Sequence, residues 1–182
     1  MKYNKTIILK DGRTCVLRNG TQDDKEKSLE NFILTHRQTD WLLTYPDEIN
    51  YTAEEQGEYL RKKEESENEA EILAFIGDRL VGTAGIESLG NQYKLRHRCD
   101  FGISVDEDFQ GLGIGKALTK ALIELAKQAG YSQMELQAVA DNEVALRLYK
   151  SVGFVEYGRN PKGFKSRLTG YQELVLMSLA LD

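Results

Sequence analysis

The residues from Val105 to Leu118 are the part of the sequence that most clearly suggests chemistry. They read Val-Asp-Glu-Asp-Phe-Gln-Gly-Leu-Gly-Ile-Gly-Lys-Ala-Leu, with three glycines and a lysine close together. A β-rich run precedes this stretch and a helical pattern of leucines follows it. Free amides at a helix N-terminus bind phosphate, and glycines let the phosphate approach the backbone closely. The stretch therefore predicts a phosphate-binding turn, although a turn with no ligand is a second interpretation.

Two familiar phosphate motifs do not fit this turn. A Walker A loop needs glycine where Gln110 stands and Ser or Thr where Ala117 stands. The dinucleotide fingerprint Gly-x-Gly-x-x-Gly needs unequal spacing, whereas Gly111, Gly113 and Gly115 are evenly spaced. Neither a nucleotide-binding switch domain nor a dinucleotide-binding domain is favoured.

The spacing Gln110-x-x-Gly113-x-Gly115 resembles the coenzyme A signature Arg/Gln-x-x-Gly-x-Gly/Ala of the GNAT superfamily of N-acetyltransferases. Upstream, residues 101–105 (Phe-Gly-Ile-Ser-Val) are similar to the central strand of that family. Downstream, residues 141–154 are similar to its Asn-x-x-Ala-x-x-x-Tyr-x-x-x-Gly-Phe block. The resemblance covers roughly residues 80–154 and joins two motifs in the right order.

The resemblance implies that acetyl-CoA lies between two central strands that splay apart. Backbone amides of the glycine turn would bind the pyrophosphate, and the central strand would pair with the pantetheine arm. Amides near Val105 would also polarise the thioester carbonyl. The residues implied in cosubstrate binding are Ile103, Ser104, Val105, Gln110, Gly111, Leu112, Gly113, Ile114, Gly115, Lys116, Asn142 and Tyr149.

Asn142 and Tyr149 are seven residues apart and share one face of a predicted helix. The resemblance implies that Asn142 contacts pantetheine and that Tyr149 protonates the departing thiolate as general acid. A thiol pKa of about 8.5 against about 10 for tyrosine makes that transfer feasible. The structural alternatives are a helix cap for Asn142 and a core position for Tyr149.

A proton must leave the acceptor amine before it attacks, because alkyl amines have pKa values of about 8 to 10. Asp100 and Glu87 are the candidate catalytic carboxylates, although either is equally well a surface or structural acid. Strand alternation places Asp100, Gly102 and Ser104 on one face. His97 has a suitable pKa as a base, but its place between two arginines favours a solvent-facing position.

Residues of the first two helices, the loop between them and the segment 158–171 are expected to select the acceptor. An aromatic and acidic lining would suit a cationic amine. The candidates for acceptor binding are Trp41, Tyr45, Glu87 and Tyr171, together with Asp40 and Tyr51. The alternative for the aromatic residues is a core or loop-anchoring position.

The elements that must position these residues are a mixture of strands and helices, with strand hairpins before the glycine turn. Strands are predicted at residues 6–9, 14–18, 71–76, 80–89, 96–105, 134–139, 154–157 and 173–179. Helices are predicted from residue 21, where Leu29, Phe32 and Ile33 share a face, at residues 52–68, after the glycine turn and at residues 141–151. The predicted fold is mixed α/β of the α+β type, a GNAT fold whose mostly antiparallel, splayed sheet is flanked by helices.

Length and composition bound the function. The 182 residues suit one domain spanning 1–182, and no signal peptide or membrane-length apolar run is evident. A net charge of −5 disfavours nucleic acid as a partner. Cys15 and Cys99 match no metal spacing, so we expect free thiols, a cytoplasmic location and no metal.

Together these patterns predict an acetyl-CoA-dependent N-acetyltransferase whose acceptor is a primary amine of a small molecule, such as a polyamine or an amino acid. No membrane partner is expected, and a homodimer is compatible with the resemblance. Two alternatives stay open: transfer to a protein N-terminus or lysine, and a catalytically silent CoA-binding sensor. The acceptor, the range of acyl groups and the general base are not determined by the sequence.

Overall fold

A computed structural model describes residues 1–181 of the chain. The α-helices and strands in chain order are β1 (Asn4–Ile8), β2 (Thr14–Asn19), α1 (Lys25–Gln38), α2 (Ala53–Glu65), β3 (Ala70–Ile76), β4 (Arg79–Ser88), β5 (Arg98–Val105), α3 (Ile114–Gln128), β6 (Gln133–Val139), α4 (Glu143–Ser151), β7 (Val155–Ser166) and β8 (Gly170–Ala180). Short 3-10 turns stand at Gln22–Asp24, Pro46–Glu48 and Glu107–Phe109.

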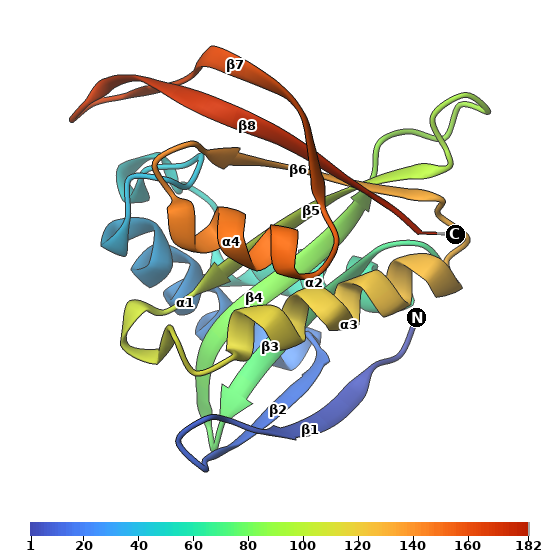
Figure 1. Cartoon of the computed structure of the whole chain (residues 1–182). Helices are drawn as coiled ribbons and strands as arrows, with labels where there is room; N and C mark the ends of the chain where they lie inside the picture. The colour runs from blue at the N-terminus through green and yellow to red at the C-terminus, as the bar shows by residue number, and fades with distance from the viewer. Residues whose placement is uncertain (182) are drawn as a thin grey trace.

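The strands form one eight-stranded sheet within the described residues, in the order β1-β2-β3-β4-β5-β6-β8-β7. Every neighbouring pair is antiparallel except β5 and β6, which are parallel. The mixed, mostly antiparallel sheet confirms the predicted fold class. In Figure 1, α3 and α4 lie on the near face of the sheet, and α1 and α2 lie behind it.

The two faces of the sheet differ in what they bury. Leu118, Leu122 and Leu125 of α3 are buried in the main hydrophobic cluster together with Ile86 and Phe101. The face of α1 that is buried is polar and carries Ser28, Asn31, Thr35 and His36. The predicted apolar face, Leu29, Phe32 and Ile33, is only partly buried. The three residues do lie on a helix, as their spacing predicts, but the fully buried positions of that helix are polar.

The sheet opens between β5 and β6. These strands pair over three positions only, Arg98 with Gln133, Cys99 with Met134 and Asp100 with Glu135. Beyond Asp100 the edge of β5 that faces β6 has no strand partner, while β4 still pairs with β5 as far as Val105. The predicted splay of the two central strands is confirmed.

The largest difference from the predicted elements lies at the C-terminal end. Residues 158–171 were expected to be a polar segment between two strands, but they complete the long β7–β8 hairpin. The segment is polar because β7 is an edge strand and mostly exposed. Pro161 is accommodated where the pairing register shifts, between Asn160 and Phe164, as is usual for proline in a strand.

Smaller differences concern the ends of elements. The predicted capping box of α2 is present, since Thr52 Oγ1 accepts from the Glu55 amide at 3.2 Å. The helix ends at Glu65 rather than at Asn68. The central strand begins at Arg98 rather than Arg96, because residues 92–97 form turns. Both cysteines are free and buried.

Asp106 fixes the chain where β5 leads into the glycine turn. Its carboxylate is fully buried and accepts hydrogen bonds of 2.8 Å from both Gln38 Nε2 and Arg79 Nη2. Its amide donates to the Val81 carbonyl at 2.9 Å. The residue thus ties α1, β4 and the turn together, which holds the turn at the open edge of β5.

Replacing Asp106 with alanine should lower the free energy of unfolding by about 2–3 kcal/mol, because two charge-assisted hydrogen bonds are lost in a buried place. Urea unfolding followed by circular dichroism would measure the change. Asp108→Ala is the matched control, since its side chain is 72% exposed and lies 3.9 Å from Arg79. Equal losses in both variants would contradict the assigned role.

Candidate active site

The glycine turn presents free amides at the start of α3. Gly111 and Gly113 have φ angles of 77° and 99°, which glycine adopts far more readily than other residues. Helix α3 begins at Ile114, and the first amide that donates into it is that of Ala117, to the Gly113 carbonyl at 3.1 Å. The amides of residues 114–116 consequently have no acceptor within the helix. This geometry fits an anionic group.

Two contacts hold the turn, and lysines surround it. Gln110 Nε2 donates to the Val105 carbonyl at 3.2 Å, and the Lys10 amide donates to the Leu112 carbonyl at 3.2 Å. A cavity of about 330 Å³ beside the turn is bordered by Lys10, Lys116 and Lys120. The three ammonium groups add positive charge to the helix N-terminus, which favours an anion further.

Helix α4 lies beside the start of α3 and carries the predicted acid. Tyr149 is buried and meets Phe101 of β5 edge-on, with 6.1 Å between ring centroids. Burial raises the pKa of the Tyr149 phenol, which keeps it protonated and makes it a weaker acid in the absence of ligand. Asn142 caps α4, since its Oδ1 accepts from the Ala145 amide at 3.2 Å. The capping alternative for Asn142 is thus observed, and a contact with pantetheine stays a prediction for its amide nitrogen.

The other face of β5 borders a larger cavity of about 620 Å³. Gly102, Ile103 and Ser104 of β5 contribute to its wall, as do residues of α1, α2 and the loop between them. The Ser104 hydroxyl accepts from Thr35 Oγ1 at 3.3 Å. Ile103 and Ser104, two of the three residues predicted to bind pantetheine, therefore lie between the open edge of the sheet and this cavity.

The cavity is acidic and holds no lysine or arginine among the described residues of its wall. Its four carboxylates are Glu55, Glu71, Glu87 and Asp100. Its one histidine, His36, has a pKa lowered by burial and is therefore neutral near pH 7. A positively charged ligand would be favoured in this space. In residues 1–181 no group of His, Cys, Asp and Glu side chains is arranged to bind a metal ion.

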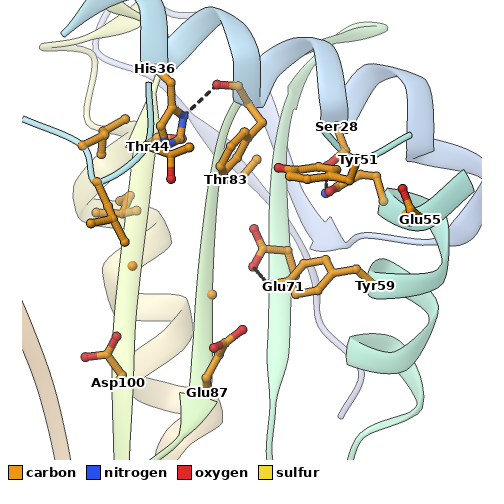
Figure 2. Close-up of a pocket in the computed structure, with 18 residues that line it drawn as sticks. Ser28, His36, Thr44, Tyr51, Glu55, Tyr59, Glu71, Thr83, Glu87 and Asp100 are labelled. Carbon is orange, nitrogen blue, oxygen red and sulfur yellow. Dashed lines mark hydrogen bonds between the residues drawn. The ribbon is translucent and has the colours of Figure 1, made fainter. Parts of the chain in front are cut away.

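The two carboxylates predicted as catalytic lie opposite each other on β4 and β5, and Figure 2 shows them side by side. Glu87 Oε1 accepts from the ammonium of Lys63 at 2.8 Å, and the same ammonium bonds Glu69. Burial and the charges of Glu87 and Glu135 raise the pKa of Asp100 to about 6. Asp100 lies where β5 is still paired with β6.

Glu71 of β3 is the acid that sequence reasoning missed. It is half-buried in the cavity wall, and the hydroxyl of Tyr59 donates to its Oε2 at 3.2 Å (Figure 2). Burial raises the pKa of this carboxyl, and the hydrogen bond from Tyr59 opposes that rise in part. The resulting pKa is about 7. The available signal was one glutamate within the apolar run Ala-Glu-Ile-Leu-Ala-Phe-Ile.

The aromatic residues predicted for the acceptor are placed differently. Tyr51 lines the cavity, whereas Trp41, Tyr45 and Tyr171 are not among its wall residues. The Tyr45 hydroxyl donates to Asp40 Oδ1 at 2.8 Å and accepts from the Arg167 amide at 2.9 Å. Tyr45 therefore anchors the loop, which was the alternative for these residues. Trp41 and Tyr171 are exposed, and a role in acceptor binding stays a prediction for them.

The fold is similar to that of solved acetyltransferases. The acetyltransferase of the GNAT family from Streptococcus pneumoniae superposes with a TM-score of 0.87 at 24% identity, over 91% of this chain and 99% of that protein. The Salmonella typhimurium protein yncA, solved with its cofactor acetyl-CoA, gives a TM-score of 0.80 at 18% identity, over 92% of this chain and 94% of that one. At these identities the likeness concerns the fold.

The sequence adds membership of a family. The profile of the Acetyltransferase (GNAT) family matches residues 31–154, and the chain belongs to this family. The N-alpha-acetyltransferase RimI of Mycobacterium tuberculosis is 40% identical over 87 residues, which are 48% of this chain and 52% of that protein. The chain spans about half of that relative's length, and 24% and 37% of the length of two other relatives. No helix within residues 1–181 has the length and apolar character needed to cross a membrane.

Replacing Glu71 with glutamine should stabilise the fold at neutral and alkaline pH. Folding raises the pKa of the Glu71 carboxyl from 4.5 to about 7. The folded state of the parent protein therefore loses stability as the pH rises through that interval, because the unfolded chain ionises first. Glutamine has no such loss, so the variant should gain at most on the order of 3 kcal/mol over the parent above pH 7 and little below pH 4.5.

Thermal unfolding at pH 4.5, 6 and 8 would measure this difference. Glu67→Gln is the matched control, because Glu67 is exposed in the turn before β3. The role of burial would be refuted by a Glu71→Gln variant whose advantage in Tm does not grow with pH.

Proposed function

We propose that the chain is an N-acetyltransferase that transfers the acetyl group of acetyl-CoA to a primary amine of a small cationic molecule. The observation that carries the proposal is the position of β5. One side of this strand has an unpaired edge next to the glycine turn, and the other borders an acidic cavity. A thioester bound along the edge and an amine bound in the cavity would meet at this strand.

The proposed roles follow from the local geometry. The free amides after Gly113 and the surrounding lysines would bind the diphosphate of acetyl-CoA. The unpaired groups of residues 103–105 would bind its amide-containing arm as an added strand. Tyr149, protonated beside Phe101, would donate a proton to the sulfur as the thiolate leaves.

The charge of the cavity supports a cationic acceptor such as a polyamine. Four carboxylates and a neutral histidine face the space, so an acceptor with its own carboxylate next to the amine would be disfavoured. Among the amines that sequence reasoning proposed, this favours polyamines over amino acids.

A second acceptor is favoured by the relatives. RimI of M. tuberculosis is named as an N-alpha-acetyltransferase, and an Escherichia coli protein that is 32% identical over 82 residues is named as a ribosomal protein bS18 alanine N-acetyltransferase. That match covers 45% of this chain and 55% of the E. coli protein. An α-amine of a protein N-terminus is therefore the alternative acceptor.

Incubation with acetyl-CoA and one acceptor at a time should release free thiol fastest with di- and polyamines. The panel would include amino acids, aminoglycosides and a peptide with a free alanine N-terminus, and thiol release would be followed with a colorimetric reagent. Faster thiol release with the peptide would show that the preferred acceptor is a protein N-terminus and not a small amine.

The matched control for this panel is Gly113→Glu, in which a side chain and a negative charge enter a position with a φ of 99°. Its affinity for acetyl-CoA should fall at least about tenfold in calorimetry, since it opposes both the backbone geometry and the anion. Wild-type affinity in this variant would refute the assigned turn.

Replacing Tyr149 with phenylalanine should lower kcat by about 10²-fold while acetyl-CoA still binds, because only the proton donor is removed. Steady-state thiol release and calorimetry would separate the two effects. A CoA-binding sensor without turnover predicts instead that neither the parent nor the variant releases thiol above the uncatalysed rate.

A further inference from the structure

Two glycines lie in line with Glu71 across the centre of the sheet. The pairing register joins Glu71 of β3 to Gly85 of β4, and Gly85 to Gly102 of β5. A Cβ atom at Gly85 would lie 2.2 Å from Glu71 Oε2, so the carboxylate occupies the space that a side chain on β4 would fill. A Cβ atom at Gly102 would meet nothing within 4 Å. The two glycines therefore leave a channel across β4 and β5. The Glu71 carboxylate lies in the part above Gly85, and the part above Gly102 is open.

The channel brings the carboxylate close to the open edge of the sheet. Neighbouring strands are about 4.8 Å apart, so a group above Gly85 is about one strand spacing from β5. Gly102 is also the second residue beyond Asp100, where the pairing of β5 with β6 ends. Glu87 and Asp100 lie in the next row, on the side where β5 and β6 are still paired.

Glu71 differs from Glu87 in its partners. Tyr59 is its hydrogen-bonded neighbour, and no arginine or lysine of residues 1–181 forms an ion pair with it. The nearby Lys63 is bonded to Glu69 and Glu87 instead. The carboxylate is thus held in place by a neutral donor and keeps its capacity to take a proton from a ligand.

We infer that Glu71 is the catalytic base of the proposed reaction and that it removes a proton from the ammonium of the acceptor in the row of Gly85 and Gly102. The inference rests on the proposed function and identifies the base that sequence reasoning sought in Asp100 and Glu87. Glu71 belongs to a different strand, β3, and reaches the reaction only because β4 has a glycine opposite it.

The proton balance of the step is simple. One proton of R–NH₃⁺ passes to the Glu71 carboxylate, which frees the electron pair of the nitrogen. The nitrogen then bonds to the thioester carbon, and the carbon–sulfur bond breaks with its electron pair on sulfur. The sulfur takes a proton from Tyr149, the second proton of the amine restores Tyr149, and the amide keeps the third. The products are an amide, a free thiol and one proton released from Glu71 to water.

The acidity of Glu71 suits this task. Its pKa of about 7, raised by burial, lies near the pH at which a general base works best. The other titratable groups that face it are Tyr59, Lys63 and Glu55 from α2, His36 from α1, Tyr51, Glu87 from β4 and Asp100 from β5. Tyr59 stays protonated because burial raises its pKa, so it donates to the carboxylate throughout the working range.

The first test is the pH dependence of kcat/KM for Glu71→Gln with the best acceptor of the panel. The parent should show an acidic limb centred near pH 7. The variant should lose that limb, fall about 10²-fold at pH 7 and recover toward pH 10, where alkyl amines are neutral without a base. Glu71→Asp should keep an acidic limb with a reduced kcat. Glu67→Gln, an exposed change of the same kind, serves as the control.

The second test is Gly85→Ala, which leaves the carboxylate in the chain and displaces it. The new methyl carbon would lie 2.2 Å from the present position of Glu71 Oε2 and force the carboxylate away, so kcat should fall about tenfold or more. Adding Gly85→Ala to Glu71→Gln should cost little more than Glu71→Gln alone, because both changes act on one group. Gly85→Ala alone, whose Glu71 is retained, keeps the inference testable if Glu71→Gln folds poorly.

Three results would overturn the inference. The first is a Glu71→Gln variant with the kcat and acidic limb of the parent, and the second is a rise in KM alone, which marks a binding residue. The third is full additivity of the two substitutions. A parent protein that binds acetyl-CoA but acetylates no amine would instead refute the proposed function, and would be seen before any variant is made.

Discussion

The structure depends on the point at which β5 and β6 stop pairing. Backbone amides and carbonyls must find partners, and a central strand that loses one neighbour in mid-course leaves a row of them unsatisfied. Only three residue pairs join β5 to β6, yet β5 continues to Val105 against β4. The remaining groups are available to an extended ligand, and the glycine turn follows directly at the end of the same strand.

Contacts on both faces and at the end of β5 hold the strand in place beside this opening. Asp106 is fully buried and ties the end of β5 to α1 and to β4, so the turn cannot move far from the strand. Phe101 packs on one side of β5 against Tyr149, while Asp100 and Gly102 face the cavity on the other. The alternation of one short strand thus separates the hydrophobic support of the site from its acidic chamber.

The parts of the site that depend on local sequence could be predicted, and the parts that depend on register could not. Gln110 to Lys116 form a contiguous motif whose glycines require special backbone angles, so their role is visible in the chain. Glu71, Gly85 and Gly102 are far apart in sequence and become neighbours only when three strands pair in one register. The ion pair of Lys63 with Glu87 could not be predicted either, because Lys63 lies on a helix 24 residues earlier in the chain.

Some misplacements came from using composition as a guide to burial. The segment 158–171 is polar because an edge strand faces water, so its composition resembles that of a loop. The buried face of α1 is polar, so the usual relation between hydrophobic periodicity and packing does not hold for this helix. Tyr45 and Asp40 are aromatic and acidic as an amine pocket would require, but they bond the β7–β8 hairpin.

The contact between the loop that carries Asp40 and the β7–β8 hairpin links segments more than a hundred residues apart. Asp40 Oδ2 accepts from the Ser166 hydroxyl at 2.6 Å and from Gln172 Nε2 at 3.2 Å, and Arg167 bonds Asp47 at 2.7 Å. Leu42, Leu43 and Thr44, which lie between these anchors, form part of the cavity wall. The hairpin and the loop should therefore have evolved as one unit, with substitutions at residue 40 accompanied by changes at residues 166 and 172. A chimaera that exchanges acceptor preference between relatives would need both segments from the same parent.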